Sequence, residues 1–270
     1  MRNHILPFIG NLYLDEITRQ HIVQMLAAHS PGHAPASTNR VLVLTRTIFN
    51  CALRWETPGI TKNATDKATL LPVNNERERF LDANEMRRLF RALDDSDAKM
   101  LKHIIAMLML TGARKSEVLN AKWLDFDLIN FSWRIEFNKS GKTRYVPLSH
   151  NAVALIKQLP TIPGCEYAFA NPKTKRPFVS IYNSWNTARK KAGLSDVRIH
   201  DIRHSHASLL VNRGHSLYEV QKILGHTQIK TTQRYAHLSQ ERLLAATNDV
   251  ADFIDSTLLI EDTKIINNAA

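Results

Sequence analysis

The sequence predicts a mainly α-helical protein, in which a small helical domain precedes a larger, mostly helical domain with a small antiparallel sheet. Three observations support this prediction. Apolar residues recur at helical spacing through most of the 270-residue chain. A polar stretch from Thr57 to Arg79, which contains Pro58 and Pro72, separates two such regions. Two short strand-like runs, SWRIEF and TRYVPL, flank the turn sequence NKSGK, a pattern typical of a β-hairpin.

In the first region, residues 15–29 have the apolar spacing of one helix. The turn sequence SPGHAPAS follows, and Ser37 or Thr38 is then the expected cap of a long helix that ends near Trp55. We therefore predict a helical domain over residues 1–57. A linker is predicted over 58–75, because the polar stretch has few apolar residues with which to form a core.

In the second region, residues 76–240, Asp82 and Glu85 form a capping box at the start of a helix. An apolar helix from about Lys99 is ended by Gly112, and a short helix begins near Arg114. Residues 122–128 are candidates for a third strand beside the hairpin. Further helices are predicted near residues 149–159, 180–192, 200–213, 216–224 and 227–235.

The charge is positive and unevenly distributed. Lys and Arg number 36 against 25 Asp and Glu, for a formal net charge of +11. Residues 76–240 carry 27 basic and 15 acidic residues, whereas residues 241–270 carry 2 and 6. This excess favours a polyanionic partner, nucleic acid first, bound by the second region rather than by the acidic tail.

Cysteine usage and hydropathy limit the class of protein. Cys51 and Cys165 stand in unrelated contexts, which excludes a disulfide framework and a zinc knuckle. No apolar run approaches the roughly 20 residues that cross a bilayer. The N-terminus MRNHILPFIG lacks the apolar core and cleavage site of a signal peptide. We expect a soluble cytoplasmic protein.

Tyr235, in TTQRYAHL, is the candidate nucleophile. A free phenol has a pKa near 10, so it needs a base or strong local positive charge before it attacks. A single tyrosine at a helix end is more often a packing residue, but His226 precedes this one by nine positions. His226 follows the helix-ending Gly225, where it can donate to a phosphate oxygen or merely interact with the helix dipole.

Arg114 in TGARKSE and Arg203 in HDIRHSH are candidate phosphate ligands. A guanidinium matches two phosphate oxygens and stabilises the negative charge that they gain in the transition state. A cation at a helix start is unfavourable for the helix dipole, so Arg114 needs a partner. Glu117, three residues on, is the expected one.

His200 and Arg203 lie three residues apart, so a helix directs both side chains the same way. His200 and His204 also have the i,i+4 spacing of some metal sites. Because Arg203 between them would repel a divalent cation, we assign no metal there. We expect His204 and His206 to make structural hydrogen bonds.

Lys139, at the turn of the hairpin, is a candidate general acid for a departing 5′ oxygen. The alternative is a solvated lysine, and Lys142 and Arg144 are close enough to compete for the role. Lys142 and Arg144, together with Lys115, are expected to contact the nucleic acid.

Five segments together resemble the catalytic domain of the tyrosine recombinases, the phage-integrase family. They are TGARKSE, the hairpin lysine, the VPL strand, HDIRHSHASLL and VQKILGHTQIKTTQRYAHL. It is most similar to phage and genomic-island integrases, over residues 76–240. Residues 1–57 are similar, more weakly, to the family's SAM-like helical core-binding domain. The fold implied is that of tyrosine recombinases and type IB topoisomerases.

The resemblance implies a site-specific DNA recombinase in the integration or excision of a mobile element. Tyr235 would attack the scissile phosphate, form a 3′-phosphotyrosine and release a 5′-hydroxyl. Neither metal, ATP nor another cofactor would be needed, because the phosphotyrosine retains the bond energy. The resemblance gives the other residues roles in phosphate binding (Arg114, Arg203, His226), leaving-group protonation (Lys139), proton transfer at the tyrosine (His200) and orientation of the arginines (Glu117, Asp201).

The implied partners are double-stranded DNA at attachment or recombination sites, three further protomers in a homotetramer on that DNA, and accessory DNA-bending proteins. The implied location is the bacterial cytoplasm, with the nucleoid. Nothing here corresponds to the family's arm-binding domain, and the helix expected before HILPFIG is missing, so we predict an N-terminally truncated core-binding domain. The tail, residues 241–270, either docks onto a neighbouring protomer or folds onto its own domain.

Two other function classes compete. SLYEVQKILGHTQIKTTQRY resembles two helices around a glycine turn, as in a non-catalytic helix-turn-helix protein. That hypothesis explains the charge but not the contexts of Arg114, Lys139, His200 and Tyr235. A metal-dependent nuclease is disfavoured, because the sequence has no carboxylate cluster.

Overall fold

The computed structural model describes residues 1–73, 79–136, 143–226 and 228–236, together with residues 247, 248, 250 and 252. The chain divides near residue 77 into two compact units. We call residues 1–77 the N-terminal unit and the remainder the C-terminal unit. The hypotheses on the tail concern residues of which only these last four are described.

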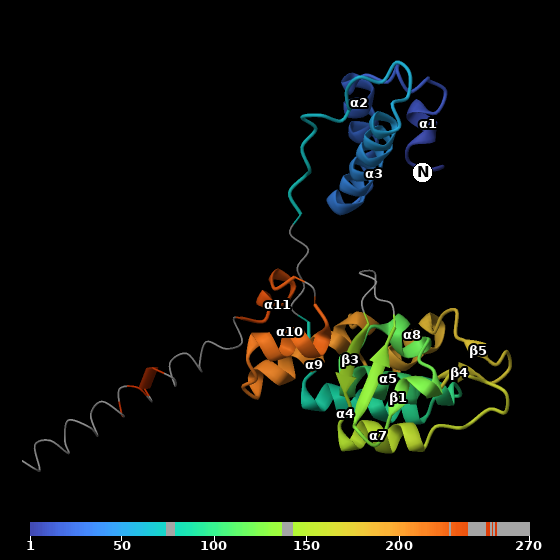
Figure 1. The fold of residues 1–270 in the computed structure, drawn as a ribbon, viewed down its shortest axis with the longest axis vertical. Helices are drawn as coiled ribbons and strands as arrows, with labels where there is room; N and C mark the ends of the chain where they lie inside the picture. Colours follow the sequence, from blue (N-terminus) through green and yellow to red (C-terminus); the bar gives the residue numbers. More distant parts are fainter. Residues whose placement is uncertain are drawn as a thin grey trace, which may run out of the picture. The chain divides into compact units, whose positions relative to one another are not determined.

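The N-terminal unit contains α1 (Leu6–Ile9), α2 (Arg19–His29) and α3 (Pro35–Arg54) (Figure 1). The predicted cap of α3 was wrong. Ser37 and Thr38 lie inside the helix, whose N-cap is Ala34 without a side-chain hydrogen bond. Pro35 occupies the first turn instead, where its fixed φ suits a helix and its missing N–H costs nothing.

The stretch predicted as a linker packs in part onto α3. Asn63 donates to the Asn50 side-chain oxygen (2.7 Å) and to the Arg46 carbonyl (3.2 Å), and Thr65 is fully buried. The segment has few apolar residues, yet its side-chain hydrogen bonds hold it on the helix. The N-terminal unit therefore extends beyond the predicted boundary at residue 57.

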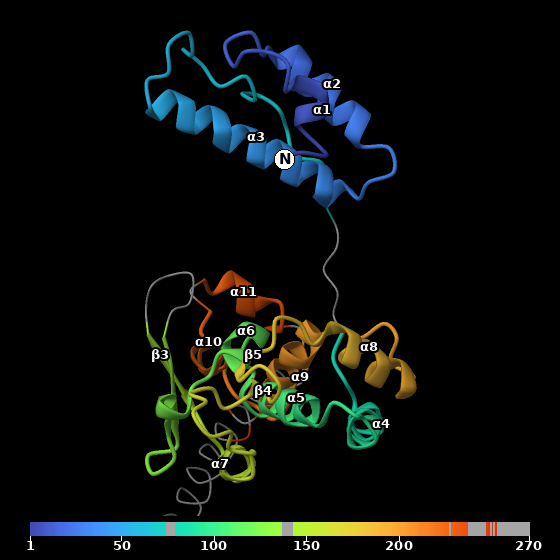
Figure 2. The same ribbon diagram turned by 90° about the vertical axis from the view of Figure 1, so that its right-hand side faces the viewer.

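Helix α5 (Lys99–Thr111) is the centre of the C-terminal unit, because it is apolar on most of its circumference. It packs against α4 (Ala83–Asp94), α6 (Lys115–Leu119), α7 (His150–Lys157) and α9 (Ile199–Asn212) (Figure 2). The capping box of Asp82 and Glu85 at the start of α4 is confirmed.

The predicted sheet is confirmed, with the order β1-β2-β3 and antiparallel pairing throughout. Its strands are β1 (Phe126–Asp127), β2 (Ser132–Ile135) and β3 (Arg144–Pro147), and the 3₁₀ helix η1 (Trp123–Asp125) precedes them. Lys139 and Lys142 at the hairpin tip lie outside the described residues. A second hairpin, β4 (Ala170–Asn171) with β5 (Arg176–Pro177), was not predicted.

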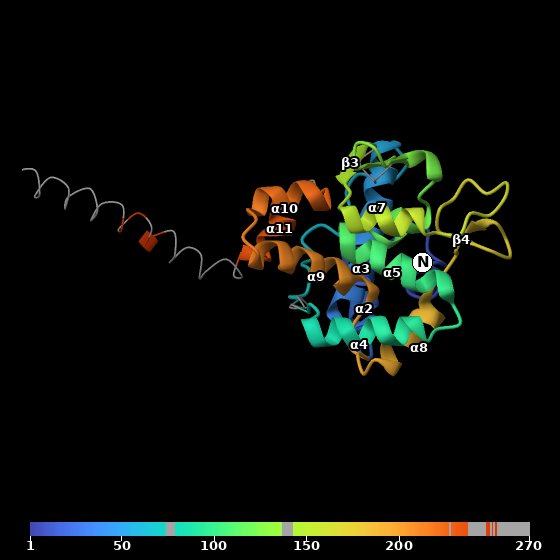
Figure 3. The same cartoon turned by 90° about the horizontal axis from the view of Figure 1, so that it is seen from below.

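The last helices are α8 (Tyr182–Lys191), α10 (Leu217–Leu224) and α11 (Lys230–Gln233). Helices α9, α10 and α11 lie side by side (Figure 3). Gly112 ends α5 and Gly225 ends α10, both with positive φ (+62° and +66°), as predicted for left-handed C-caps. None of the described helices combines the length and apolar character needed to span a membrane.

Candidate active site

Arg203 joins two helix ends. Its side chain leaves α9 and donates to the carbonyl of Gly112 (2.5 Å) at the end of α5 and to that of Leu224 (2.7 Å) at the end of α10. The residue is only 4% exposed. Because Arg114 follows Gly112 closely and begins α6, the same junction brings both predicted phosphate-binding arginines into one region.

The backbone at this junction requires glycine. A Cβ on Gly112 would lie 2.6 Å from Cδ2 of His206, in addition to the cost of its positive φ. His206 itself donates from Nδ1 to the Met109 carbonyl (2.8 Å), which is the structural hydrogen bond that we expected.

Glu117 organises a second part of the site. Its carboxylate accepts from the Arg114 backbone N–H (2.7 Å) and guanidinium (2.9 Å), which confirms the predicted pair. It also accepts from Arg144 on β3 (2.7 Å). The Arg144 side chain is 11% exposed and donates to the Ile223 carbonyl as well. The structure thus places the Arg144 side chain inside the site, where it positions Glu117; its expected contact with DNA remains a prediction.

We call Arg114, Arg144 and Arg203 the arginine cluster. Burial, and then the charges of Arg114 and Arg144, lower the pKa of Arg203 to about 10, so it remains protonated at neutral pH. Burial alone would raise the pKa of Glu117, but Arg144 and the hydrogen bonds from Arg114 hold it below its usual value. Three cations face one carboxylate, and the surplus of positive charge suits an anionic ligand.

The phenol of Tyr235 contacts His204. Tyr235 is 5% exposed, and its Oη lies 2.5 Å from Nδ1 of His204. The His204 ring packs edge-on against that of His200, with 4.7 Å between centroids. We expected His200 to assist Tyr235 and His204 to be structural; instead, His204 contacts the phenol and His200 contacts His204. The available signal was the i,i+4 spacing, which puts His204 and His200 on one helix face.

The phenol of Tyr235 and the imidazoles of His204 and His200 are all neutral at pH 7. Burial, followed by the charge of His200, lowers the pKa of His204 to about 4. Burial and the neighbouring Arg203 also lower the pKa of His200. Burial raises the pKa of Tyr235, against the opposing charges of Arg234 and Arg203. The phenol therefore keeps its proton, and if the proton of the neutral His204 ring is on Nε2, the phenol donates to Nδ1.

His226 is held by Thr232, which sequence analysis missed. Nδ1 of His226 lies 2.8 Å from the hydroxyl of Thr232, a fully buried residue of α11 three positions before Tyr235. Burial, then Arg203 and Arg114, lower the pKa of His226 to about 3. If the hydroxyl donates to Nδ1, the proton of the neutral ring is on Nε2, from which it can donate to a phosphate oxygen.

Asp201 has a different partner from the one expected. Its buried carboxylate accepts from the backbone and guanidinium of Arg198 (both 2.8 Å), so it orients that arginine at the start of α9 rather than Arg114 or Arg203. Lys115 is exposed at the start of α6, where contact with DNA remains a prediction.

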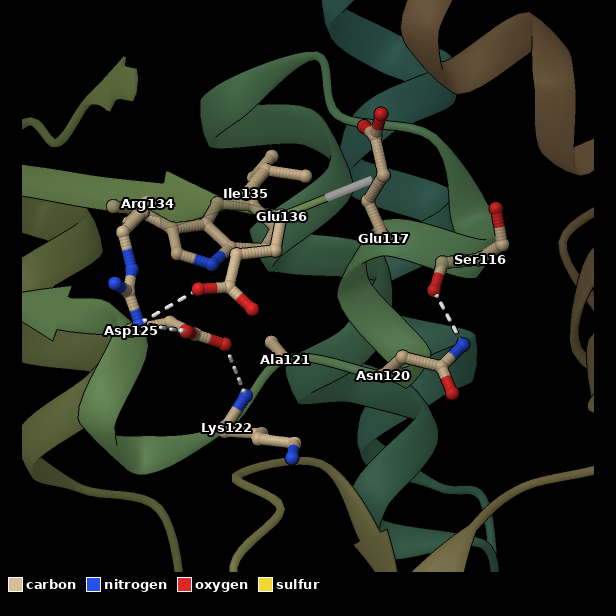
Figure 4. Close-up of a pocket in the computed structure, with 10 residues that line it drawn as sticks. Ser116, Glu117, Asn120, Ala121, Lys122, Asp125, Arg134, Ile135 and Glu136 are labelled. Atoms are coloured by element: carbon tan, nitrogen blue, oxygen red, sulfur yellow. Dashed lines mark hydrogen bonds and ion pairs between the residues drawn. The ribbon is translucent and has the colours of Figure 1, made fainter. Parts of the chain in front are cut away.

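A pocket of about 410 Å³ lies on the other side of α6, between that helix, η1 and β2 (Figure 4). Several of its polar side chains already have partners within the pocket: Arg134 pairs with Asp125 and Glu136, and Asn120 donates to the backbone carbonyl of Ser116. In Figure 4 the Glu117 carboxylate points away from these pairs, towards its own arginines. Acidic groups line this pocket, so a phosphate is expected at the arginine cluster and not here.

Comparison with known proteins agrees with this geometry. Residues 79–242 match the model of the phage integrase family. The chain is 26% identical over 242 residues to a tyrosine recombinase of Thermosipho africanus, covering 87% of this chain and 85% of the relative. It is 30% identical over 187 residues to XerC of Staphylococcus aureus, covering 63% of this chain and 62% of that one. It is also 30% identical to the integrase of Salmonella phage P22, covering 66% and 49%.

Solved structures share the fold. Lambda integrase, as residues 75–356 in a dimer bound to a core site, superposes with a TM-score of 0.69 at 22% identity, over 84% of this chain and 85% of the other. The catalytic domain of bacteriophage HP1 integrase gives a TM-score of 0.51 at 28% identity, over 63% and 93%. The chain therefore belongs to the phage integrase family of site-specific tyrosine recombinases.

Proposed function

We propose that this protein cleaves and rejoins DNA at specific sites through a 3′-phosphotyrosine on Tyr235, without metal or ATP, in the integration or excision of a mobile element. One observation carries the proposal: a buried phenol, two histidines packed edge-to-face and a surplus of guanidinium groups meet where α5 and α10 end and α9 begins. Such a combination holds a phosphodiester and attacks it.

The proposed steps follow from the contacts. The scissile phosphate binds the arginine cluster, first through Arg114, whose side chain is 40% exposed. His226 donates to a non-bridging oxygen. As Tyr235 attacks phosphorus, its proton passes to Nδ1 of His204, while His200 packs against the His204 ring. The bond between phosphorus and the 5′ oxygen breaks, and Lys139 protonates this departing oxygen. A 5′-hydroxyl of another duplex reverses the step.

The proposed partner is double-stranded DNA at recombination sites. The solved structures that share the fold of this chain include a lambda integrase dimer bound to a core site and a lambda integrase tetramer bound to a Holliday junction. By analogy, we propose that this chain acts as a tetramer on two duplexes, with accessory DNA-bending proteins where the sites lie apart.

A covalent-trapping experiment tests the proposal. A nicked duplex with the cognate core site is incubated with the wild type, with Tyr235→Phe and with the control Tyr218→Phe, which changes an exposed tyrosine of α10. We expect a protease-sensitive, slower DNA band on a denaturing gel for the wild type and the control, unchanged by EDTA. Bound DNA without such a band in the wild type, or a band that persists in Tyr235→Phe, would refute the mechanism.

A further inference from the structure

Three histidines of the N-terminal unit meet outside the active site. His4 precedes α1, His29 is the last residue of α2, and His33 lies in the following turn. Nε2 of His29 is 3.2 Å from Nδ1 of His4, and the rings of His29 and His33 stack with centroids 4.0 Å apart. One ligand nitrogen from each of the three lies within 4.8 Å of the others.

Neighbouring groups anchor one nitrogen of two of the rings and leave the other nitrogen of each available to a metal ion. Nδ1 of His33 lies 2.8 Å from the His29 carbonyl, and because a carbonyl only accepts, this nitrogen carries the proton. Its Nε2 therefore has a free lone pair. Nδ1 of buried His29 contacts the hydroxyl of Thr38 on α3 (3.1 Å), which leaves Nε2 of His29 facing His4. Metal-binding histidines commonly have their second nitrogen anchored in this way.

The spacing fits a tetrahedral ion. With metal–nitrogen distances of about 2.0–2.1 Å, two ligands on one tetrahedral zinc lie roughly 3.3 Å apart. The 3.2 Å between His29 and His4 already has this value. His33 is exposed, so its ring is free to tilt towards the other two.

We propose that His4, His29 and His33 bind a zinc ion, with water as the fourth ligand. Three imidazoles without a carboxylate suit zinc and not magnesium or calcium, which prefer oxygen. Helix α1 has four residues and is too short to persist on its own hydrogen bonds. The ion fastens the segment before α1 to α2 and, through Thr38, to α3. This site is independent of the proposed DNA chemistry.

The test uses the tag-free full chain with cobalt as the spectroscopic probe and zinc as the stabilising ion. We expect one equivalent of Co²⁺ to give the intense visible absorption of a tetrahedral site, and Zn²⁺ to displace it. Zinc at 100 times its Kd should slow amide exchange in residues 1–12 on the order of 100-fold, because opening of the site releases the ion. Magnesium should have no effect.

The double variant His4→Gln/His33→Gln changes two exposed side chains and leaves buried His29 in place, so the unit still folds. It should lose both the absorption and the zinc-dependent protection. The matched control His21→Gln removes a histidine of the same unit, and glutamine retains the capping hydrogen bond that His21 makes to Thr18. Absence of the cobalt spectrum in the wild type, or an equal spectrum in the double variant, would overturn the proposal.

Discussion

The two units bury different kinds of polar side chain. The N-terminal unit buries neutral groups that hydrogen-bond to one another or to the backbone, namely His29, Thr38, Thr45, Asn63 and Thr65. The C-terminal unit buries the charged residues Asp201 and Arg203 together with His204. Buried charge lowers stability unless it is well paired, and groups with strongly shifted pKa values concentrate at functional sites. The comparison indicates that the C-terminal unit retains unfavourable charges for chemistry, whereas the N-terminal unit uses polar groups for structure.

The largest expected effect comes from removing Arg203. We expect Arg203→Met to reduce the single-turnover cleavage rate at saturating DNA about 100- to 1,000-fold, since the transition state loses a preformed cation. The melting temperature should change little, because the variant no longer buries a charge or repels Arg114 and Arg144, and this relief offsets the lost hydrogen bonds.

The matched control for this change is Arg46→Met in the N-terminal unit. Arg46 also donates to a backbone carbonyl, that of Ala68 (2.8 Å), but it lies in the N-terminal unit and is not part of the arginine cluster. Its loss should lower stability and leave the cleavage rate of bound DNA unchanged. If both variants lost the same cleavage rate, the conclusion that the C-terminal unit keeps its buried charges for catalysis would be wrong.

Glu117→Gln should lower the free energy of unfolding by about 3 kcal/mol, because the buried Arg144 loses its counter-ion. Urea denaturation monitored in the C-terminal unit measures this change. In Glu219→Gln, an exposed residue at the start of α10, glutamine can keep the capping bond and the loss should stay below about 0.5 kcal/mol. A similarly small loss at Glu117 would contradict the role assigned to it.

Alanine substitutions at two glycines with positive φ distinguish the cost of backbone strain from the cost of a steric clash. Gly164→Ala meets no atom within 4 Å, so it should cost only the conformational strain, about 1 kcal/mol. In Gly225→Ala the new Cβ would lie 2.6 Å from Cδ of buried Arg144, and we expect about 2 kcal/mol together with slower cleavage. If the two variants lose the same stability, Gly225 does not hold Arg144 in place.

A more gradual effect is the dependence of stability on pH. The folded pKa values of His204 and His226, about 4 and about 3, lie below the unfolded value near 6.5. Unfolding therefore takes up protons below pH 6.5, and stability that is complete above this pH declines as the pH falls. We expect a loss of roughly 1–2 kcal/mol for His204 between pH 7 and pH 5, measured by urea denaturation and reduced in His204→Asn.

In the N-terminal unit, burial and then the charges of His33 and His4 lower the pKa of His29. This one buried histidine should make the unit less sensitive to acid than His204 and His226 together make the C-terminal unit. A larger acid loss there than in the C-terminal unit would reverse the comparison. Constant stability between pH 7 and pH 5 would show that the active-site histidines are less buried than the structure indicates.

The features that the sequence predicted depend on residues close together in the chain. The capping box at Asp82, the glycine helix ends, the hairpin and the Arg114–Glu117 pair are examples. Each rests on periodicity or on contacts between residues three or four positions apart, which a single sequence displays. Ser37 and Thr38 failed as caps because a proline two or three residues earlier already begins the helix.

Tertiary structure alone decided how these pieces form one site. Arg203 meets the Gly112 carbonyl 91 positions away, Glu117 meets Arg144 across 27, and His204 meets Tyr235 across 31. No local pattern encodes these partners, because they depend on how α5, α9, α10 and β3 pack. By itself, the sequence determined which chemical groups the protein carries and where its helices begin and end. Packing decided which arginine holds the carboxylate and which histidine contacts the phenol.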